Sequence, residues 1–261
     1  MSRLYYFVGT SLPEIQLGVP PDISFEELIA LYRQNLSSKD WKQVEIILRL
    51  VDLENLRALW LNRYLDVRGN YDANTLQETL LTGGEEVPSY VADFLDKWDK
   101  PVDRVSHFAA LLSAYFTDES VRAQGFLREY LVFEHSLQLV LVGFRAKKLG
   151  RDLSVELQYE DPENEIVAEI LAQKDAKNFE PPEAFTDIKP LFEEYENDPI
   201  GLKQALDAYR FEKINEMIGL QELSTDRLLG YLIQFLLNER ILALDRQKGL
   251  SVVRTIVEGV S

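Results

Sequence analysis

The residues best suited to chemistry in this chain form a polar series inside a strongly apolar stretch, residues 44–69. Asp52 and Asn55 lie three residues apart in it, beside Arg49 and Arg57. A carboxylate, an amide and guanidinium groups gathered in a cleft could form the active site of an enzyme. The same pattern is typical of side chains that hydrogen-bond between packed helices. Because no nucleophile, metal site or histidine accompanies the series, we favour the structural interpretation.

The other candidate groups form no recognised catalytic or metal-binding motif. His107 and His135 are the two histidines, and neither belongs to an HExxH motif or to an Asp/Glu-x-x-His pair. An acidic segment near position 161 resembles a calcium loop, but Ile166 replaces its glycine and Ala172 its bidentate glutamate. Glycine motifs of the GxxxxGK[ST] or GxGxxG type are absent from the sequence. We therefore expect no catalytic residue, no cofactor, no metal and no enzymatic activity.

Composition narrows the classes of partner and location. The 261 residues carry a formal net charge of −16, which disfavours nucleic acid and anionic lipid as partners. Hydrophobic residues make up 46% of the chain, enough for a substantial core, and there is no cysteine, which fits a reducing compartment. The longest apolar runs fall short of the roughly 18 residues that a membrane span needs, and the start lacks signal-peptide features. We expect a cytoplasmic protein with no transmembrane segment.

Helical periodicity dominates the chain and predicts an all-α fold. One short aromatic-aliphatic run, Leu4–Val8, suggests either a strand or an extended N-terminal arm. Ser24 and Glu27 have the spacing of a capping box. The predicted helices with two defined ends cover residues 24–35, 72–81, 88–98, 163–173, 187–196, 200–218 and 226–247. A further long helix begins within 37–40 and includes the apolar segment, another begins at 101, and another runs from 118 or 120 to 148. A short final element covers 251–257.

The apolar stretch recurs later in the sequence at a constant offset of 81 residues, which aligns Leu56 with Leu137 and Gly69 with Gly150. Both copies end in a cationic turn closed by the glycine. A helix that is apolar on nearly all sides is buried in a bundle. The repeat therefore predicts related bundles, and we divide the chain into a first bundle, a second bundle, an acidic proline-rich insert and closing helices. These cover residues 1–85, 86–151, 152–199 and 200–261.

The insert carries most of the negative charge. Between Glu156 and Asp198 there are fourteen acidic residues and three lysines, so this segment supplies −11 of the net charge. A solvated surface of loops and short helices is the simpler interpretation, and we favour it. The alternative is a docking face for a basic protein.

Two segments resemble a known family. Residues 52–59, with Asp52, Asn55, Leu56 and Arg57, resemble the D-x-x-N-L repeat of the C/d subunit of V/A-type rotary ATPases. Residues 130–137 are similar in frame but lack the acid and the asparagine. The closing segment from Tyr231-Leu232 through Glu239 is similar to the last helix of that family. In this chain Ala243 replaces the asparagine of the family motif, and Arg246 lies two positions after the place of its arginine.

Over nearly the whole chain the sequence is more similar to a bacterial family of uncharacterised proteins encoded beside V/A-type ATPase genes. Members of that family open with a Tyr-Tyr-aliphatic run and a Leu-Pro, as Tyr5-Tyr6-Phe7 and Leu12-Pro13 do here. They continue with a Leu-Ser and an acid before the first buried helix, as Leu36-Ser37 and Asp40 do.

The resemblance implies a funnel of helical bundles with a mechanical function. The protein would be a non-catalytic subunit that couples the central rotor shaft to the membrane ring during ATP-driven proton or sodium transport. It would be cytoplasmic and held at the inner membrane by those partners, and Asp52, Asn55, Leu56, Arg57, Glu239 and Arg246 would be structural. The alternatives are a free-standing acidic adaptor or assembly factor that binds a basic protein, and an enzyme with a site at Asp52, Asn55 and Arg57.

Overall fold

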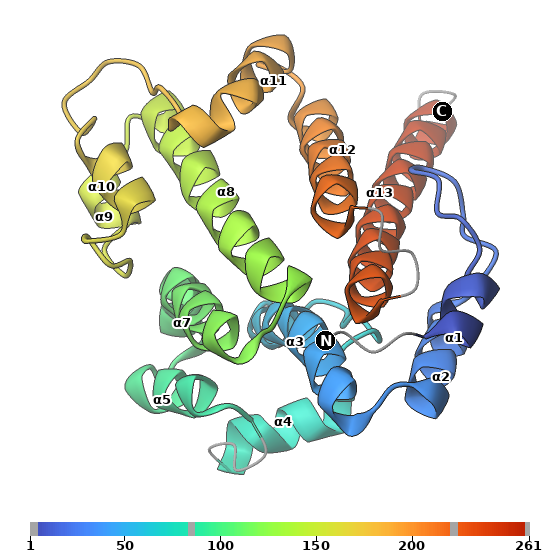
Figure 1. Cartoon of the computed structure of the whole chain (residues 1–261). Helices are drawn as coiled ribbons and strands as arrows, with labels where there is room; N and C mark the ends of the chain where they lie inside the picture. The colour runs from blue at the N-terminus through green and yellow to red at the C-terminus, as the bar shows by residue number, and fades with distance from the viewer. Residues whose placement is uncertain (1–4, 83–86, 220–223, 259–261) are drawn as a thin grey trace. The chain divides into compact units, whose positions relative to one another are not determined.

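A computed structural model describes residues 5–82, 87–219 and 224–258, and their side chains except those of 79, 81–82 and 245–258. Every regular element in these ranges is helical, which confirms the all-α fold class (Figure 1). The funnel-like arrangement of repeated bundles stays a prediction.

The helices follow the predicted order closely. In chain order they are α1 Tyr6–Ser11, α2 Phe25–Asn35, α3 Ser38–Trp60, α4 Ala73–Thr82, α5 Ser89–Lys97, α6 Pro101–Ser106, α7 Phe108–Arg122, α8 Phe126–Leu149, α9 Leu153–Glu156, α10 Glu165–Leu171, the 3₁₀ helix η1 Glu183–Ile188, α11 Lys189–Glu194, α12 Pro199–Ile218 and α13 Thr225–Glu258. The capping box that starts α2 is confirmed, because the Ser24 hydroxyl accepts from the Glu27 N–H and the Glu27 carboxylate accepts from the Ser24 N–H.

The chain divides into two compact units. One unit joins the two ends of the chain, residues 1–40 and 187–261, and the other comprises residues 41–186. The predicted boundaries at 85, 151 and 199 concern repeats in sequence order, and they stay a prediction.

In the 41–186 unit, α7 packs against α5 and α8, and α8 packs against α9 and α10. Leu56 of α3 and Leu137 of α8, the matched positions of the sequence repeat, are both almost fully buried. Leu111, Leu127 and Val140 are buried with them in the same unit. Removing this much apolar surface from water supplies the main driving force for the fold of the unit.

In the other unit, α12 packs along α13, α11 packs on α12 and α1 packs on α2. The buried face of α13 includes Leu228, Leu232 and Phe235, and the Phe235 ring lies 6.2 Å from that of Phe25. The Tyr32 hydroxyl donates to the Leu228 carbonyl at 2.7 Å. The first helices and the last helix therefore share one core.

The predicted extended N-terminal arm is wrong. Residues Tyr6–Ser11 form α1, and the Gly9 N–H donates to the Tyr5 carbonyl in a helical hydrogen bond. The Thr10 and Ser11 hydroxyls cap carbonyls one turn back. A helix this short needs contacts outside itself. Tyr5, just before its first residue, supplies one, because the Tyr5 hydroxyl donates to Asp40 at 2.6 Å.

Three helix boundaries of the structure also differ from the predicted ones. The stretch 44–69 is neither one helix nor two helices joined near Asp52, because α3 runs unbroken through Asp52 and ends at Trp60. Gly69 lies in the following loop, so the first repeat does not end in a glycine-closed helix as α8 does at Gly150. A positive φ of 54° at Gly125 separates α7 from α8, where we predicted that the later helix begins at 118 or 120. The backbone of α13 continues through Gly249 to Glu258. The glycine pair 83–84, predicted to end a helix, lies outside the described residues.

Candidate functional site

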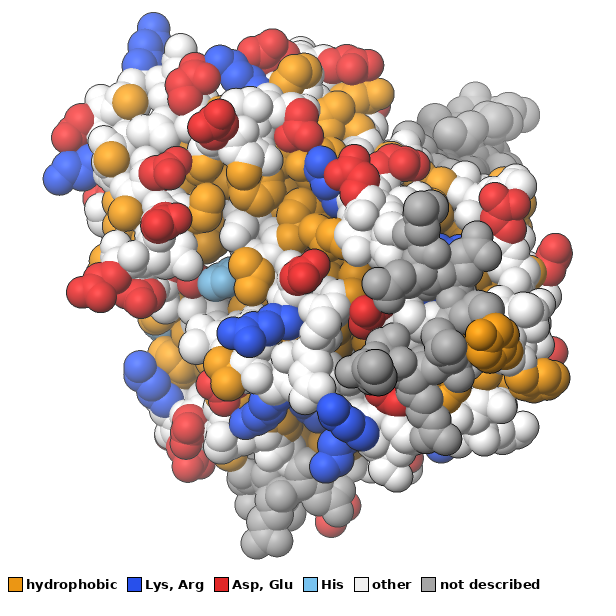
Figure 2. Space-filling model, viewed as in Figure 1, with side chains coloured by type: hydrophobic (Ala, Val, Ile, Leu, Met, Phe, Trp, Pro, Cys, Tyr) orange, Lys and Arg blue, Asp and Glu red, His pale blue; other side chains and the backbone are white. Residues whose placement is uncertain are grey.

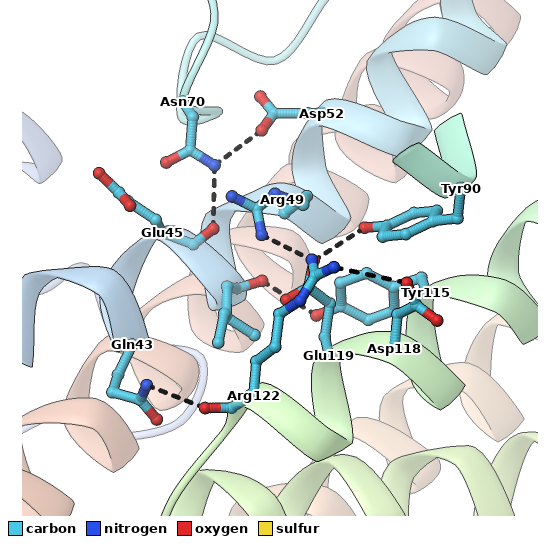
Figure 3. Close-up of polar contacts among 11 residues, drawn as sticks. Gln43, Glu45, Arg49, Asp52, Asn70, Tyr90, Tyr115, Asp118, Glu119 and Arg122 are labelled. Carbon is cyan, nitrogen blue, oxygen red and sulfur yellow. Dashed lines mark hydrogen bonds and ion pairs between the residues drawn. The ribbon is translucent and has the colours of Figure 1, made fainter. Parts of the chain in front are cut away.

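The polar series of α3 holds the loop that follows the helix, residues 61–72. Asn55 accepts a hydrogen bond from the Asp66 N–H and donates one to the Asp66 carbonyl, both at 2.7 Å. Asp52 accepts from the Asn70 amide at 2.7 Å and from the Tyr71 N–H at 3.2 Å. Figure 3 shows the Asn70 amide placed between Asp52 and the Glu45 carbonyl, to which it also donates at 3.0 Å. The series therefore joins a helix to a loop, whereas we expected it between packed helices.

Gly69 belongs to this arrangement because the loop passes directly over the two side chains. A Cβ at Gly69 would collide with Asp52 Oδ1 and lie 3.4 Å from Asn55 Nδ2. The position therefore needs glycine for close approach rather than for an unusual backbone conformation.

Asp52 is the most chemically unusual carboxyl of the series. Burial raises its pKa to about 6, against the hydrogen bonds from Asn70 and Tyr71 and the charge of Arg49, which all lower it. A pKa near neutrality suits a general base. However, Asp52 is 3% exposed and both of its oxygens accept hydrogen bonds from the loop. The carboxyl is therefore turned toward the chain itself rather than toward a substrate.

A second buried carboxylate, Glu119 of α7, was missed by the sequence analysis. Its Oε1 accepts from Arg49 at 2.7 Å, from the Tyr90 hydroxyl at 3.1 Å and from Arg122 at 3.4 Å (Figure 3). Glu119 is fully buried, and this single atom joins α3, α5 and α7. The signal was present in the sequence: Leu111, Tyr115 and Glu119 recur every four residues, which places an acid on the buried face of the helix.

Burial and the Glu119 carboxylate together set the pKa values of Arg49 and Tyr90. Burial is the largest influence on Arg49 and lowers its pKa, but the charge of Glu119, the hydrogen bond to Glu119 and smaller contributions from Tyr90 and Tyr71 together raise it. The net pKa is raised, so the guanidinium stays protonated. Burial and the same carboxylate both raise the pKa of Tyr90, which keeps its phenol neutral. An ion pair inside a helix bundle holds its partners in place, and breaking one partner is costly.

The remaining predicted positions do not join these groups. Leu56 is a core residue. Arg57 is half-buried, lies 3.7 Å from Glu54 and stacks over the Phe108 ring at 5.0 Å. Glu239, on α13 in the other unit, is partly buried, and the side chain of Arg246 lies outside the described residues. The structure therefore brings together Asp52 and Asn55, but not Arg57.

An asparagine in the other unit has the same function as Asn55. Asn238 of α13 is fully buried, accepts from the Gly18 N–H at 2.7 Å and donates to the Val19 carbonyl at 2.7 Å. The sequence analysis included Asn238 only as part of the resemblance of the last helix. Both units thus use a buried asparagine on a long helix to fix the backbone of a remote loop.

Two observations bear on ligands and membranes. In the described part of the chain, no group of three or more histidine, aspartate or glutamate side chains is arranged to hold a metal ion. His135 instead contacts Glu160 at 3.0 Å and stacks on Phe116, and His107 stacks on Trp98. Among the described helices, none contains a stretch that is both long and apolar enough to cross a bilayer.

Comparisons with known proteins place the whole chain in one family. The model of the family described as "Protein of unknown function (DUF2764)" matches residues 1–261. An uncharacterised protein of Chlamydia trachomatis serovar D is 32% identical over 260 residues, covering 98% of each chain. A protein of Chlamydia muridarum is 30% identical over 261 residues, again covering 98% of each chain. No solved structure matches the chain.

Proposed function

We propose that this chain, which belongs to the DUF2764 family, is a non-catalytic helical component of a V/A-type rotary ATPase, located between the rotor shaft and the membrane ring. The observation that carries the non-catalytic assignment is the position of the motif residues. Asp52 and Asn55, the polar members of the D-x-x-N-L resemblance, are both 3% exposed and bind the chain's own loop. Residues held in this way stabilise a shape rather than bind a substrate.

The all-helical architecture supports the mechanical part of the proposal. A component that transmits torque must resist deformation, and densely packed helices have low compressibility. In the 41–186 unit this packing is reinforced by Glu119, which links three helices through one buried carboxylate. The proposed location is cytoplasmic and peripheral to the inner membrane, through contacts with the shaft and the ring.

The experiment is co-purification from the organism that encodes the chain. Membranes are isolated from cells that express the tagged full-length protein, solubilised mildly, and passed over the tag resin. The proposal expects shaft and ring subunits of the V/A-type ATPase in the eluate, in constant ratio to the tagged chain. A protein that stays wholly in the soluble fraction without these subunits contradicts the proposal.

A control variant separates specific from non-specific recovery. Asn55→Ala and Asn238→Ala each release a loop from a helix and should reduce recovery, because both loosen the shape that the partners bind. Asn74→Ala changes an exposed asparagine of α4 and should leave recovery unchanged. Equal recovery with all three variants would indicate adhesion to the resin or to membranes.

The alternative function, an acidic adaptor or assembly factor for a basic protein, is favoured by the acidic segment. Of its fourteen acids between Glu156 and Asp198, all but Glu156 and Glu160 are exposed. In Figure 2 acidic side chains lie over the region of α9 and α10. Neutralising Asp161, Glu163 and Glu165 together should abolish binding of a basic partner under this alternative. Under the rotary proposal the same change leaves recovery of the ATPase subunits intact.

A further inference from the structure

The loop between α3 and α4 exposes two apolar side chains that nothing in the described structure covers. Tyr64 is fully exposed, at 102%, and Val67 is 84% exposed. Both lie within residues 61–72, the loop that Asn55 and Asp52 hold against α3. Single exposed apolar residues are ordinary on a protein surface. Tyr64 and Val67, however, both belong to one loop whose backbone is held by buried side chains, so their positions are fixed before any partner binds.

The backbone on both sides of Tyr64 is fixed by named contacts. Before it, the Arg63 N–H donates to the Ala58 carbonyl at 2.8 Å and Asn62 adopts a positive φ of 50°. After it, Asp66 is bound by Asn55 on both its N–H and its carbonyl. Asp66 in turn accepts from Arg68 at 2.6 and 2.7 Å, so the turn itself is braced by an ion pair.

A fixed loop binds a partner at lower entropic cost than a loose one. Ordering a loop and its side chains on binding opposes association, and a loop that is already ordered avoids much of that cost. Here the fixing groups are buried polar side chains, which are costly to bury unless they are hydrogen-bonded. Because these groups are hydrogen-bonded, they stabilise the loop and also hold the backbone that carries Tyr64 and Val67 in one conformation.

The charge at the tip identifies the kind of partner. Arg63 is exposed and forms no ion pair with a described residue, next to Tyr64 on a chain whose net charge is −16. Tyrosine and arginine are the residue types most enriched at the energetic centres of protein interfaces. The exposed cation of Arg63 beside these apolar side chains fits a pocket that is apolar at its base and rimmed by carboxylates. A second copy of this chain carries a net charge of −16 and an anionic membrane is negative over its whole surface, so the net charge of this chain would repel both. The inferred partner needs carboxylates only at the rim of one pocket.

We propose that the 61–72 loop is a preformed docking element, in which Tyr64 and Val67 enter an apolar pocket of another protein and Arg63 pairs with carboxylates at its rim. The inference does not depend on the rotary proposal, because it rests on the exposure and fixation of this loop alone.

The test is site-specific photo-crosslinking with the full-length chain in the organism that encodes it. p-Benzoylphenylalanine replaces Tyr64, which keeps an aromatic ring at the tip, and in the control it replaces Val121 of α7, which is 76% exposed. The proposal expects one other protein joined at position 64 and not at position 121. The crosslinked peptide of that protein should lie in an apolar pocket beside aspartate or glutamate residues.

Further substitutions at the tip make the result decisive. Val67→Ser and Arg63→Glu should each reduce the crosslink yield by roughly fivefold or more, whereas Arg63→Lys should keep most of it. Circular dichroism should not change in these variants, because the altered side chains are exposed. The proposal is overturned by equal yields at 64 and 121, by a yield insensitive to Arg63→Glu, or by crosslinks only to a second copy. Flotation of the chain with phosphatidylglycerol vesicles in a Tyr64-dependent manner would overturn it in favour of a membrane.

Discussion

Asn55 closes a ring of chain by pairing with the backbone of Asp66, eleven residues later, through two hydrogen bonds of 2.7 Å. One bond uses the amide oxygen of Asn55 and the other its amide nitrogen, so the side chain satisfies both polar groups of one peptide position. Buried backbone groups need such partners, and a loop without regular structure has few of them. The pairing explains how residues 61–72 keep one conformation without helix or strand.

Asn55→Ala should lower the free energy of unfolding by about 2–4 kcal/mol. The change removes two hydrogen bonds and leaves the Asp66 backbone groups without partners, each of which costs about 1–2 kcal/mol. Urea unfolding of the full chain, followed by circular dichroism, measures the effect. Asn74→Ala, at an exposed position on α4, serves as the matched control and should change stability by less than about 0.5 kcal/mol. Similar values for both variants would mean that the Asn55 pairing does not stabilise the fold.

Gly69→Ala should destabilise the chain only while Asp52 is present. The added methyl group would collide with Asp52 Oδ1, which the Tyr71 N–H holds in place. We expect a loss of about 1–3 kcal/mol in the natural background. In an Asp52→Ala background the space is vacant, so the same substitution should cost much less. A double-mutant cycle by urea unfolding measures the coupling, and additive effects would contradict the close approach.

Raising the pH through about 6 should remove a stabilising contribution of Asp52. Its pKa is about 6 in the folded chain and 3.8 when unfolded, so between these values the folded chain holds a proton that the unfolded chain has lost. The contribution of Asp52 to the free energy of unfolding is therefore full below about pH 4, where it is about 3 kcal/mol. This contribution is lost as the pH rises through about 6.

The measurement compares the natural chain with Asp52→Asn, which cannot titrate, in urea from about pH 5 to pH 7.5, above the pI of about 4.6. The difference between the two curves should fall across this range. Asp72 is exposed, and hydrogen bonds from Thr75 lower its pKa, so Asp72→Asn should show no fall in this window. A pH-independent difference for Asp52→Asn would show that Asp52 is ionised throughout.

Glu119→Gln should destabilise the 41–186 unit by about 3–5 kcal/mol, because it leaves the Arg49 cation buried without its counter-charge. The loss should be partly recovered in the double variant Arg49→Met with Glu119→Gln, which removes the unpaired charge. Glu54→Gln is the control, since Glu54 forms an exposed pair with Arg57 at 3.7 Å, which is worth little. Thermal unfolding is measured for the natural chain, Glu119→Gln, the double variant and Glu54→Gln. A double variant that is no more stable than Glu119→Gln alone would contradict the stabilising role of the ion pair.

The sequence by itself determined the fold class and most of the helices. Apolar residues at helical spacing identify α3, α8, α12 and the start of α13, and local signals such as Ser24 with Glu27 or Pro101 mark where helices begin. These features depend on neighbours within one or two turns, so they can be predicted from spacing alone. The same spacing showed that Asp52 and Asn55 share a polar series, and the lack of a nucleophile or histidine beside them favoured a structural function.

Only the tertiary structure decided what those side chains contact. The end of α3 at Trp60 returns the chain over its own helix, and this brings Asp66, Gly69 and Asn70 to Asn55 and Asp52. The pairs of Glu119 with Arg49 and of Asn238 with Gly18 join residues 70 and 220 positions apart. No local pattern encodes such distances, because hydrogen-bond partners of buried polar groups are set by which elements pack together. For the same reason the exposed tip at Tyr64 became visible only once the loop beneath it was seen to be fixed.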